Sequence, residues 1–129
     1  MTYQLMKDLY DSLRNNSSLT SLVPAANIKV GWQNDFSDYP AISIIQVGGR
    51  EVGQLGYKSP SGLIKEDFSP QIEIYSQASA KENYDIVDVL DNIMISCNYE
   101  KLSDADAWDD TLLAHRKITR WNKTKLFNK

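Results

Sequence analysis

His115 is the only histidine of the 129-residue chain, so acid–base or metal chemistry must use this residue or do without an imidazole. No serine lies in a GxSxG elbow, and the sequence has no HExxH, CxxC or H-x-E arrangement. The 17 acidic residues could supply carboxylate pairs, but the sequence alone gives such pairs no geometry. The sequence therefore predicts a protein that is not an enzyme, with a structural or solvent-facing histidine and no cofactor.

Two segments carry residue types that bind ions. The segment 98–110 contains four aspartates, but an EF-hand loop needs a central glycine and a closing glutamate, and both are missing at the required offsets. Gly48 and Gly49 suggest a phosphate loop, but no GxxxxGK[ST] follows, and Pro60 stands where a helix should begin. We expect a solvated acidic connection at 98–110 and no metal or nucleotide site.

Length and composition predict one globular domain over residues 1–129, with 42% hydrophobic residues and no second composition regime. No run approaches the roughly 20 apolar residues that cross a bilayer, so no membrane partner is expected. Lys7 and Asp8 interrupt the N-terminal pattern where a signal peptide would be apolar, which predicts a cytoplasmic protein. Cys97 is the single cysteine, which excludes an internal disulfide and favours a core position.

The charge is distributed unevenly along the chain. The net charge is -3, which argues against a general nucleic-acid binder. Residues 115–129 contain six basic residues and no acid, so residues 1–114 carry the remaining -9. The basic residues are Arg116, Lys117, Arg120, Lys123, Lys125 and Lys129. Such asymmetry usually concerns a partner rather than the fold.

Two helices and a strand give the clearest local patterns. Gln71–Tyr75 alternates, with Ile72 and Ile74 on one face and Gln71, Glu73 and Tyr75 on the other, as in a strand whose isoleucine side is buried and whose other side faces solvent. Ser79 and Glu82 form a capping box that opens a helix running to Cys97. Its apolar residues recur at steps of three and four, and its acids Asp85, Asp88 and Asp91 are predicted to face water. A first amphipathic helix is predicted over Thr2 to Asn15, ended by 15–18.

The other elements complete the predicted fold. Strands are expected at Ile28–Trp32, Ala41–Val47 and Thr111–Trp121. The glycine-rich segment 48–62 is expected to form a long mobile loop, and 122–129 a basic C-terminal tail. Because each helix has one apolar stripe and the sheet one clearly apolar side, both helices should pack on the same face. The predicted class is α+β, a mostly antiparallel sheet of about four strands with two helices on one face.

The order of these elements resembles a known family. The resemblance lies in the helix Leu5 to Leu13 with Leu19, Leu22 and Val23, then Tyr39-Pro40-Ala41-Ile42, and Gln71 to Ser76 running into Glu82 to Leu90. It is a resemblance to the bacteriophage tail-completion or tail-terminator proteins, which close the tail tube of long-tailed phages and join it to the head. The resemblance implies a homo-oligomeric ring, commonly a hexamer, that performs no chemistry. It also implies a place at the head–tail interface of the virion after assembly in the host cytoplasm.

The partners implied by the resemblance are the tail tube protein, the head–tail connector and further copies of the chain. DNA would pass through the ring without sequence-specific recognition. Two alternatives remain open. One is a small adaptor or binding module, such as another head–tail joining component, and the other is a nucleic-acid binder that uses the basic tail.

A closed ring requires each protomer to offer two unlike, complementary patches. The acids predicted for one patch are Asp104, Asp106, Asp109 and Asp110, with the helix acids Asp85, Asp88 and Asp91. The bases predicted for the other are Arg116, Lys117, Arg120 and Lys123. Exposed ion pairs contribute only about 0 to 1 kcal/mol each, so they would set orientation, while Trp108, Trp121 and Phe127 would supply affinity.

Overall fold

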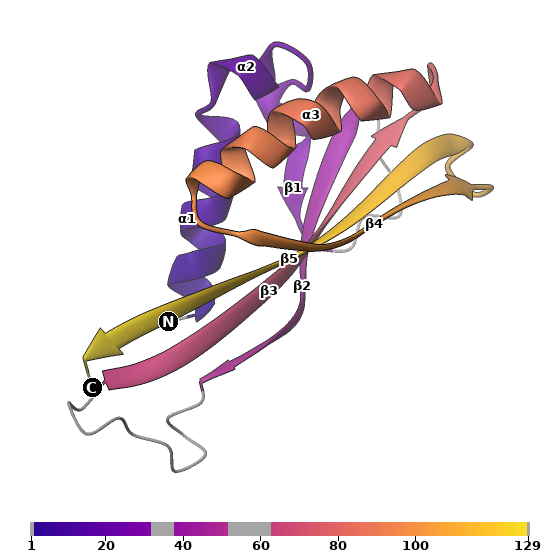
Figure 1. Ribbon diagram of the computed structural model, residues 1–129. Helices are drawn as coiled ribbons and strands as arrows, with labels where there is room; N and C mark the ends of the chain where they lie inside the picture. Colours follow the sequence, from indigo (N-terminus) through magenta and orange to yellow (C-terminus); the bar gives the residue numbers. More distant parts are fainter. Residues whose placement is uncertain (1, 32–37, 52–62, 129) are drawn as a thin grey trace.

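The computed structural model describes residues 2–31, 38–51 and 63–128. Helices cover one face of a strongly twisted sheet whose strand order is β1-β2-β3-β5-β4 (Figure 1). The elements are α1 (Thr2–Arg14), α2 (Ser17–Thr20), a 3-10 turn (Ala25–Asn27), β1 (Ile28–Val30), β2 (Ala41–Glu51), β3 (Leu63–Ser76), α3 (Ala80–Ser96), β4 (Glu100–Asp109) and β5 (Ala114–Asn128).

The α+β class and the shared helix face are confirmed, while the details of the sheet differ from the prediction. Across residues 2–31, 38–51 and 63–128, the sheet has five strands rather than about four, and it is mixed, because β1 runs parallel to β2 while the other neighbours are antiparallel. β1 also ends two residues early, at Val30 instead of Trp32. Gly31 follows with a φ of 97°, a left-handed conformation that favours glycine and turns the chain out of the strand.

The main core lies between the helices and the sheet. Ile42 and Ile44 of β2 stand opposite Ile74 and Ile72 of β3, and all four side chains are buried. The buried helix residues recur at helical spacing, namely Leu5, Leu9 and Leu13 on α1 and Ile86, Leu90, Ile93 and Met94 on α3. Each helix therefore turns its apolar stripe to the sheet, as the periodicity predicts.

Side-chain hydrogen bonds join the end of β3 to the start of α3. The Ser79 hydroxyl accepts from the Glu82 backbone amide at 3.2 Å, which is the serine half of the predicted capping box. The glutamate half differs, because the Ser79 amide donates to the Ser76 hydroxyl rather than to Glu82. The Glu82 carboxylate accepts from the Ser76 hydroxyl at 2.6 Å. That hydroxyl in turn accepts from the Ser79 amide at 3.4 Å. The last residue of β3 therefore completes the cap, which fixes the direction in which α3 leaves the sheet.

Two predicted irregular segments belong to the sheet. The acidic segment expected as a connection is strand β4, which pairs with β5 along almost its whole length. The basic segment expected as a tail is the end of β5, where residues 123–128 pair with residues 63–68 of β3. Part of the predicted 48–62 loop is also strand, because β2 continues to Glu51 through a register shift between Gln46 and Gly48. The remainder of that loop, 52–62, lies outside the described residues.

The sheet face away from the helices is also largely buried at β3, contrary to the prediction that Gln71, Glu73 and Tyr75 face solvent. Their exposed fractions are 4%, 0% and 3%. Tyr75 packs with Ala41 and Ala114 in a second, smaller apolar cluster. The buried Glu73 carboxylate is neutralised by an ion pair with Arg116 of β5.

Candidate subunit-contact surface

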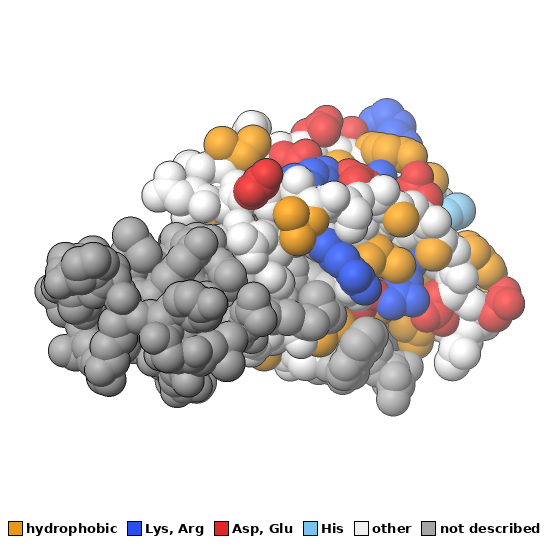
Figure 2. Space-filling model, turned by 60° about the horizontal axis from the view of Figure 1, so that its bottom comes forward, with side chains coloured by type: hydrophobic (Ala, Val, Ile, Leu, Met, Phe, Trp, Pro, Cys, Tyr) orange, Lys and Arg blue, Asp and Glu red, His pale blue; other side chains and the backbone are white. Residues whose placement is uncertain are grey.

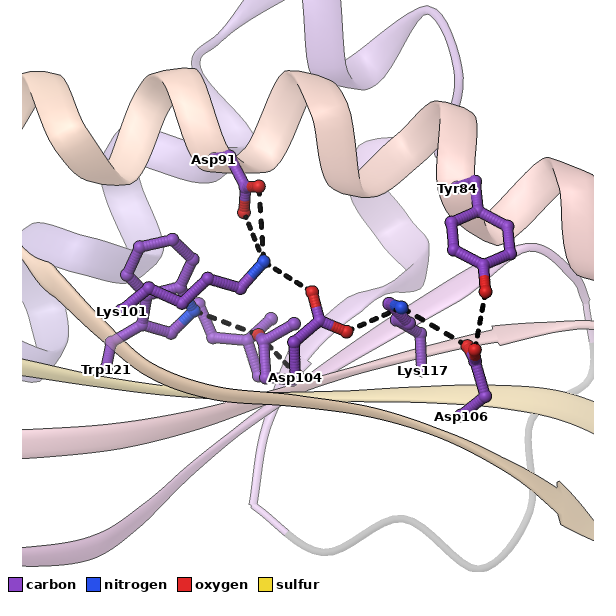
Figure 3. Close-up of polar contacts among 9 residues, drawn as sticks. Tyr84, Asp91, Lys101, Asp104, Asp106, Lys117 and Trp121 are labelled. Atoms are coloured by element: carbon purple, nitrogen blue, oxygen red, sulfur yellow. Dashed lines mark hydrogen bonds and ion pairs between the residues drawn. The ribbon is translucent and has the colours of Figure 1, made fainter.

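A row of charged side chains connects the β4–β5 hairpin to α3 (Figure 3). At one end, the ammonium of Lys101 on β4 binds Asp91 of α3 at 3.2 Å and Asp104 of its own strand at 2.5 Å. The Lys101 ammonium also lies 5.5 Å from the centroid of the buried Trp121 ring. Lys101 therefore bridges the helix and the edge strand.

The row continues along β4 through a second lysine. Lys117 of β5 binds Asp104 at 2.5 Å and Asp106 at 3.3 Å. The Tyr84 hydroxyl of α3 donates to Asp106 at 2.5 Å, and the Lys117 ammonium lies 4.4 Å from the centroid of the Tyr84 ring. We call Asp91, Lys101, Asp104, Lys117 and Asp106 the ion-pair ladder.

The ladder keeps its groups charged. Burial favours the neutral form of Asp104, but hydrogen bonds from Lys101 and Lys117 outweigh it and hold the pKa of this carboxyl below its usual value. Burial likewise opposes the charge on both lysines, but their carboxylate partners raise the pKa of Lys101 and of Lys117. The hydrogen bond to Asp106 raises the pKa of Tyr84, which keeps this hydroxyl protonated as a donor.

The ladder changes the assignment of the predicted contact residues. Asp104 and Asp106 were expected to face a neighbouring protomer, but both are neutralised by lysines of the same chain. Lys117, expected on the basic patch, is 6% exposed. Trp121, expected to supply affinity at a contact, is a core residue with 1% exposure, and its indole donates to the Thr119 hydroxyl. Lys117 and Trp121 are therefore corrected to internal positions, because β5 turns both toward the helices.

The turn of the β4–β5 hairpin carries acidic and apolar groups that do not belong to the ion-pair ladder, of which Trp108, Asp110 and Leu113 are exposed and Asp109 is half-buried. Trp108 is 52% exposed, its indole Nε1 donates to Asp110 at 2.7 Å, and its ring packs edge-on against His115 with centroids 5.1 Å apart. Leu113 is 63% exposed at a φ of 53°. Asp109 accepts from the Leu112 amide at 2.8 Å, which closes the turn. We call Trp108, Asp109, Asp110 and Leu113 the acidic tip.

Figure 2 shows acidic and apolar side chains mixed at the right-hand end of the molecule, the end at which the β4–β5 turn lies in Figure 1. The predicted strand from Thr111 begins only at Ala114, because residues 110–113 form this turn. The left-handed backbone of Leu113 is unusual for a large side chain, and it projects the leucine outward. The turn therefore presents its apolar groups to solvent rather than to the core.

Basic side chains occupy the opposite face of the same hairpin. Arg116, Ile118 and Arg120 alternate along β5 with the core-facing residues, so they point away from the helices. Arg120 is exposed, and its Nε donates to Gln71 at 2.9 Å. Arg116 forms the ion pair with Glu73 and lies 5.8 Å from the centroid of the Tyr75 ring. We call Arg116, Ile118 and Arg120 the arginine shelf.

The surface beside the arginine shelf is formed by small side chains of β4. In the pairing of β4 with β5, Ala107 stands opposite Arg116 and Ala105 stands opposite Ile118, and both alanines are exposed. Burial lowers the pKa of Arg116, but an arginine stays charged at every physiological pH. The fourth predicted base, Lys123, lies on the helix side of β5, 5.2 Å from the centroid of the Tyr99 ring.

The sequence interpretation missed several of these residues. Lys101 belongs to the ion-pair ladder, Tyr84 donates a hydrogen bond to its Asp106, and Glu73 forms an ion pair with Arg116 of the shelf. None of these three residues was predicted to be a polar partner. The alternation of acidic and small residues over 103–108 is a strand signal that could have placed Asp104, Asp106 and Trp108 on one face.

Among the described residues, shallow hollows of about 290 Å³ each lie along α3, one beside Leu22 and the other beside Asn16 and Ser18 of the α2 region. The first holds the exposed ion pair of Lys81 and Asp85, and the second is lined mainly by Asn and Ser with Val89 and Ile93. Within residues 2–31, 38–51 and 63–128, no cluster of three His, Cys, Asp or Glu side chains is placed to hold a metal ion. In the same residues, none of the helices has the length and apolar character of a membrane span.

Comparisons with known proteins give a likeness of fold. No protein-family model matches the chain, and no curated protein matches it. Among solved structures, it is similar to a chain in the virion of a native gene transfer agent particle, with a TM-score of 0.73 and 9% sequence identity. The match covers 92% of this chain and 92% of that chain. The two chains therefore share their architecture over nearly their whole length.

Proposed function

We propose that this protein is a non-enzymatic structural protein of a phage or phage-like virion. The observation that carries the proposal is the likeness of fold, over 92% of both chains, to a chain of a gene transfer agent virion. The candidate surface fits this role, since its groups are arranged as ion pairs and exposed anchors rather than as a nucleophile with a base.

Within the virion, we propose that the chain completes or terminates the tail tube as a closed ring, commonly a hexamer, and joins the tail to the head. A ring is built from one contact repeated between unlike surfaces. The hairpin supports this proposal because its tip is acidic and apolar, while its helix-free face carries two arginines. The partners would be the tail tube protein and the head–tail connector, with DNA passing through the ring.

Native mass spectrometry of the purified chain tests the ring directly. We expect a discrete ring mass at low salt, either for the free protein or after it binds tail tubes purified from the particle that encodes it. A chain that stays monomeric at high concentration and also fails to bind those tubes would refute the proposal. A single copy per connector would favour an adaptor instead. Steep salt-dependent binding to DNA would favour the nucleic-acid alternative.

A further inference from the structure

We propose that neighbouring copies of this chain meet through the β4–β5 hairpin, with the acidic tip of one copy docked on the arginine shelf of the next. This inference rests on the proposed ring and names its contact. The occupant of the shelf is thus a second copy of the same chain. Four observations carry the inference, and each concerns a described side chain of the hairpin.

The tip holds its indole in one place before any partner binds. Trp108 is 52% exposed, yet its Nε1 is bound to Asp110 and its ring rests on His115. An exposed tryptophan with a fixed orientation loses little conformational entropy on binding, and tryptophan is among the commonest binding hot spots. Leu113, exposed at the same turn, extends the apolar area.

The charged groups of the hairpin that form no ion pair within the described residues are complementary. Asp110 is bound to a neutral indole and Asp109 to a backbone amide, and no lysine or arginine of the described residues forms an ion pair with either. Arg120 donates to the neutral amide of Gln71, so its charge is also uncompensated among those residues. The carboxylates of Asp109 and Asp110, which no cation of the described residues neutralises, therefore match the charge of Arg120 on the shelf, while Arg116 stays paired with Glu73.

The shapes of the two patches also fit. The exposed Ala105 and Ala107 lie beside the shelf and leave room for a large side chain over the strand. Arg116 and Arg120 flank that space on β5, and arginine packs favourably on the face of an indole. Trp108 of the neighbouring copy can therefore contact the alanines and an arginine at once.

The patches lie on opposite sides of one ribbon. Trp108 stands opposite His115, on the side that Lys117 and Trp121 share with the helices. Arg116 and Arg120 are offset from those residues by one position, so they point to the other side. A contact between opposite sides of successive hairpins is heterologous, and repeating such a contact generates a ring or an open filament.

Cysteine cross-linking between separate copies tests the contact. In a Cys97→Ala background, one preparation carries Thr111→Cys at the turn and a second carries Ala105→Cys beside the shelf, both at exposed positions, and the two are mixed and oxidised with and without tail tubes. The control replaces Thr111→Cys by Asp88→Cys, at an exposed position on α3. Because docked thiols experience a millimolar effective concentration, we expect at least about tenfold more mixed dimer from the tip and shelf pair than from the control pair.

The outcomes separate this contact from the proposed ring. Equal yields from the two pairs, together with a ring mass for the wild-type chain, would overturn the contact and leave the ring standing. Efficient tip-to-shelf cross-linking in a chain that carries both cysteines, but with open-ended oligomers of increasing length as the product and no discrete ring, would support the contact and refute the ring. Equal yields and no ring, with tail tubes present, would overturn both. Trp108→Ala should abolish the mixed cross-link without changing the urea midpoint, which excludes unfolding as the cause.

Discussion

Replacing Asp104 by asparagine removes the carboxylate that both lysines of the ion-pair ladder share. We expect the Asp104→Asn variant to lose about 2 kcal/mol of unfolding free energy at neutral pH. Asparagine has nearly the same volume, so the substitution changes the charge and the hydrogen bonding without opening a cavity. The loss should therefore report on the ladder alone.

The expected magnitude follows from how buried each partner is. The Lys117 side chain is only 7% exposed, so its 2.5 Å contact with Asp104 resembles a buried charged hydrogen bond, worth about 1.5 to 3 kcal/mol. The contact with Lys101 is more accessible, with 27% and 30% of the two side chains exposed, and contributes about 0 to 1 kcal/mol. Lys117 keeps Asp106 and Lys101 keeps Asp91, which reduces the loss.

Urea denaturation followed by tryptophan fluorescence measures this loss, with Asp88→Asn as the matched control. Asp88 is an exposed aspartate on α3 for which the described residues supply no ion pair, so its substitution should change the unfolding free energy by less than about 0.5 kcal/mol. A loss for Asp104→Asn no larger than that of the control would refute the assignment of Asp104 as the centre of the ladder.

The dependence on pH gives a second check of the same variant. The folded protein holds the pKa of Asp104 below its ordinary value of 3.8, so its contribution is complete above that value and is lost as the pH falls through the folded pKa. The pKa values of Lys101 and Lys117 are raised above 10.5, so their contributions are complete below pH 10.5 and are lost as the pH rises through the folded values. The difference between wild type and variant should thus be constant at intermediate pH and shrink at both extremes. A difference that grows toward acid pH would contradict this account.

Three further predictions concern the core, the cap and a buried phenol. Leu90→Ala should lower the unfolding free energy by about 2 to 5 kcal/mol, because Leu90 is fully buried, whereas Leu102→Ala at an exposed position should change it by less than about 0.5 kcal/mol in the same urea assay. Ser79→Ala should lower the unfolding free energy by about 1 kcal/mol, because the helix cap of α3 is lost. Circular dichroism should show that the helical signal of the variant is lost at a lower temperature than that of the wild type. Burial raises the pKa of Tyr75 to about 12. The wild type should therefore lose unfolding free energy as the pH rises from 10 to 12, whereas the Tyr75→Phe variant should not show this loss. Identical profiles of stability against alkaline pH would contradict the burial of this hydroxyl.

Local patterns in the sequence predicted the elements whose stability is local or apolar. The stripe of α3, its Ser79 cap and the alternation of Ile72 and Ile74 all appear in the structure as predicted. These signals depend only on residues a few positions apart, and burial of one apolar face then determines which side meets the helices.

The sequence could not show which distant charges would meet. In the sequence, strand β4 looks like a solvated acidic segment. The lysines that neutralise its acids are Lys101, within the segment, and Lys117, which lies 13 positions beyond Asp104. The sequence gives no sign that Lys117 returns to Asp104, because the strand pairing that brings them together is not local. Trp121 likewise looked available for a contact, because a tryptophan near the end of a chain gives no sign of the core that covers it. Both errors arise from strand pairing across the β4–β5 turn, where one position of offset decides which side chains face the helices.

The ladder also explains why an exposed strand can hold a contact surface in place. Nearly every residue of β4 is exposed, so apolar burial contributes little to its position, and the strand depends on its pairing with β5 and on the lysines that tie it to α3. Salt screens exposed charges over about 10 Å at 0.1 M, but it screens a pair that includes a buried lysine much less. The hairpin should therefore keep its shape under ionic conditions that weaken attraction between its exposed tip and shelf. The ion-pair ladder therefore fixes the acidic strand within one protomer. The charges at the turn and on the opposite face of the hairpin remain available to a neighbouring protomer.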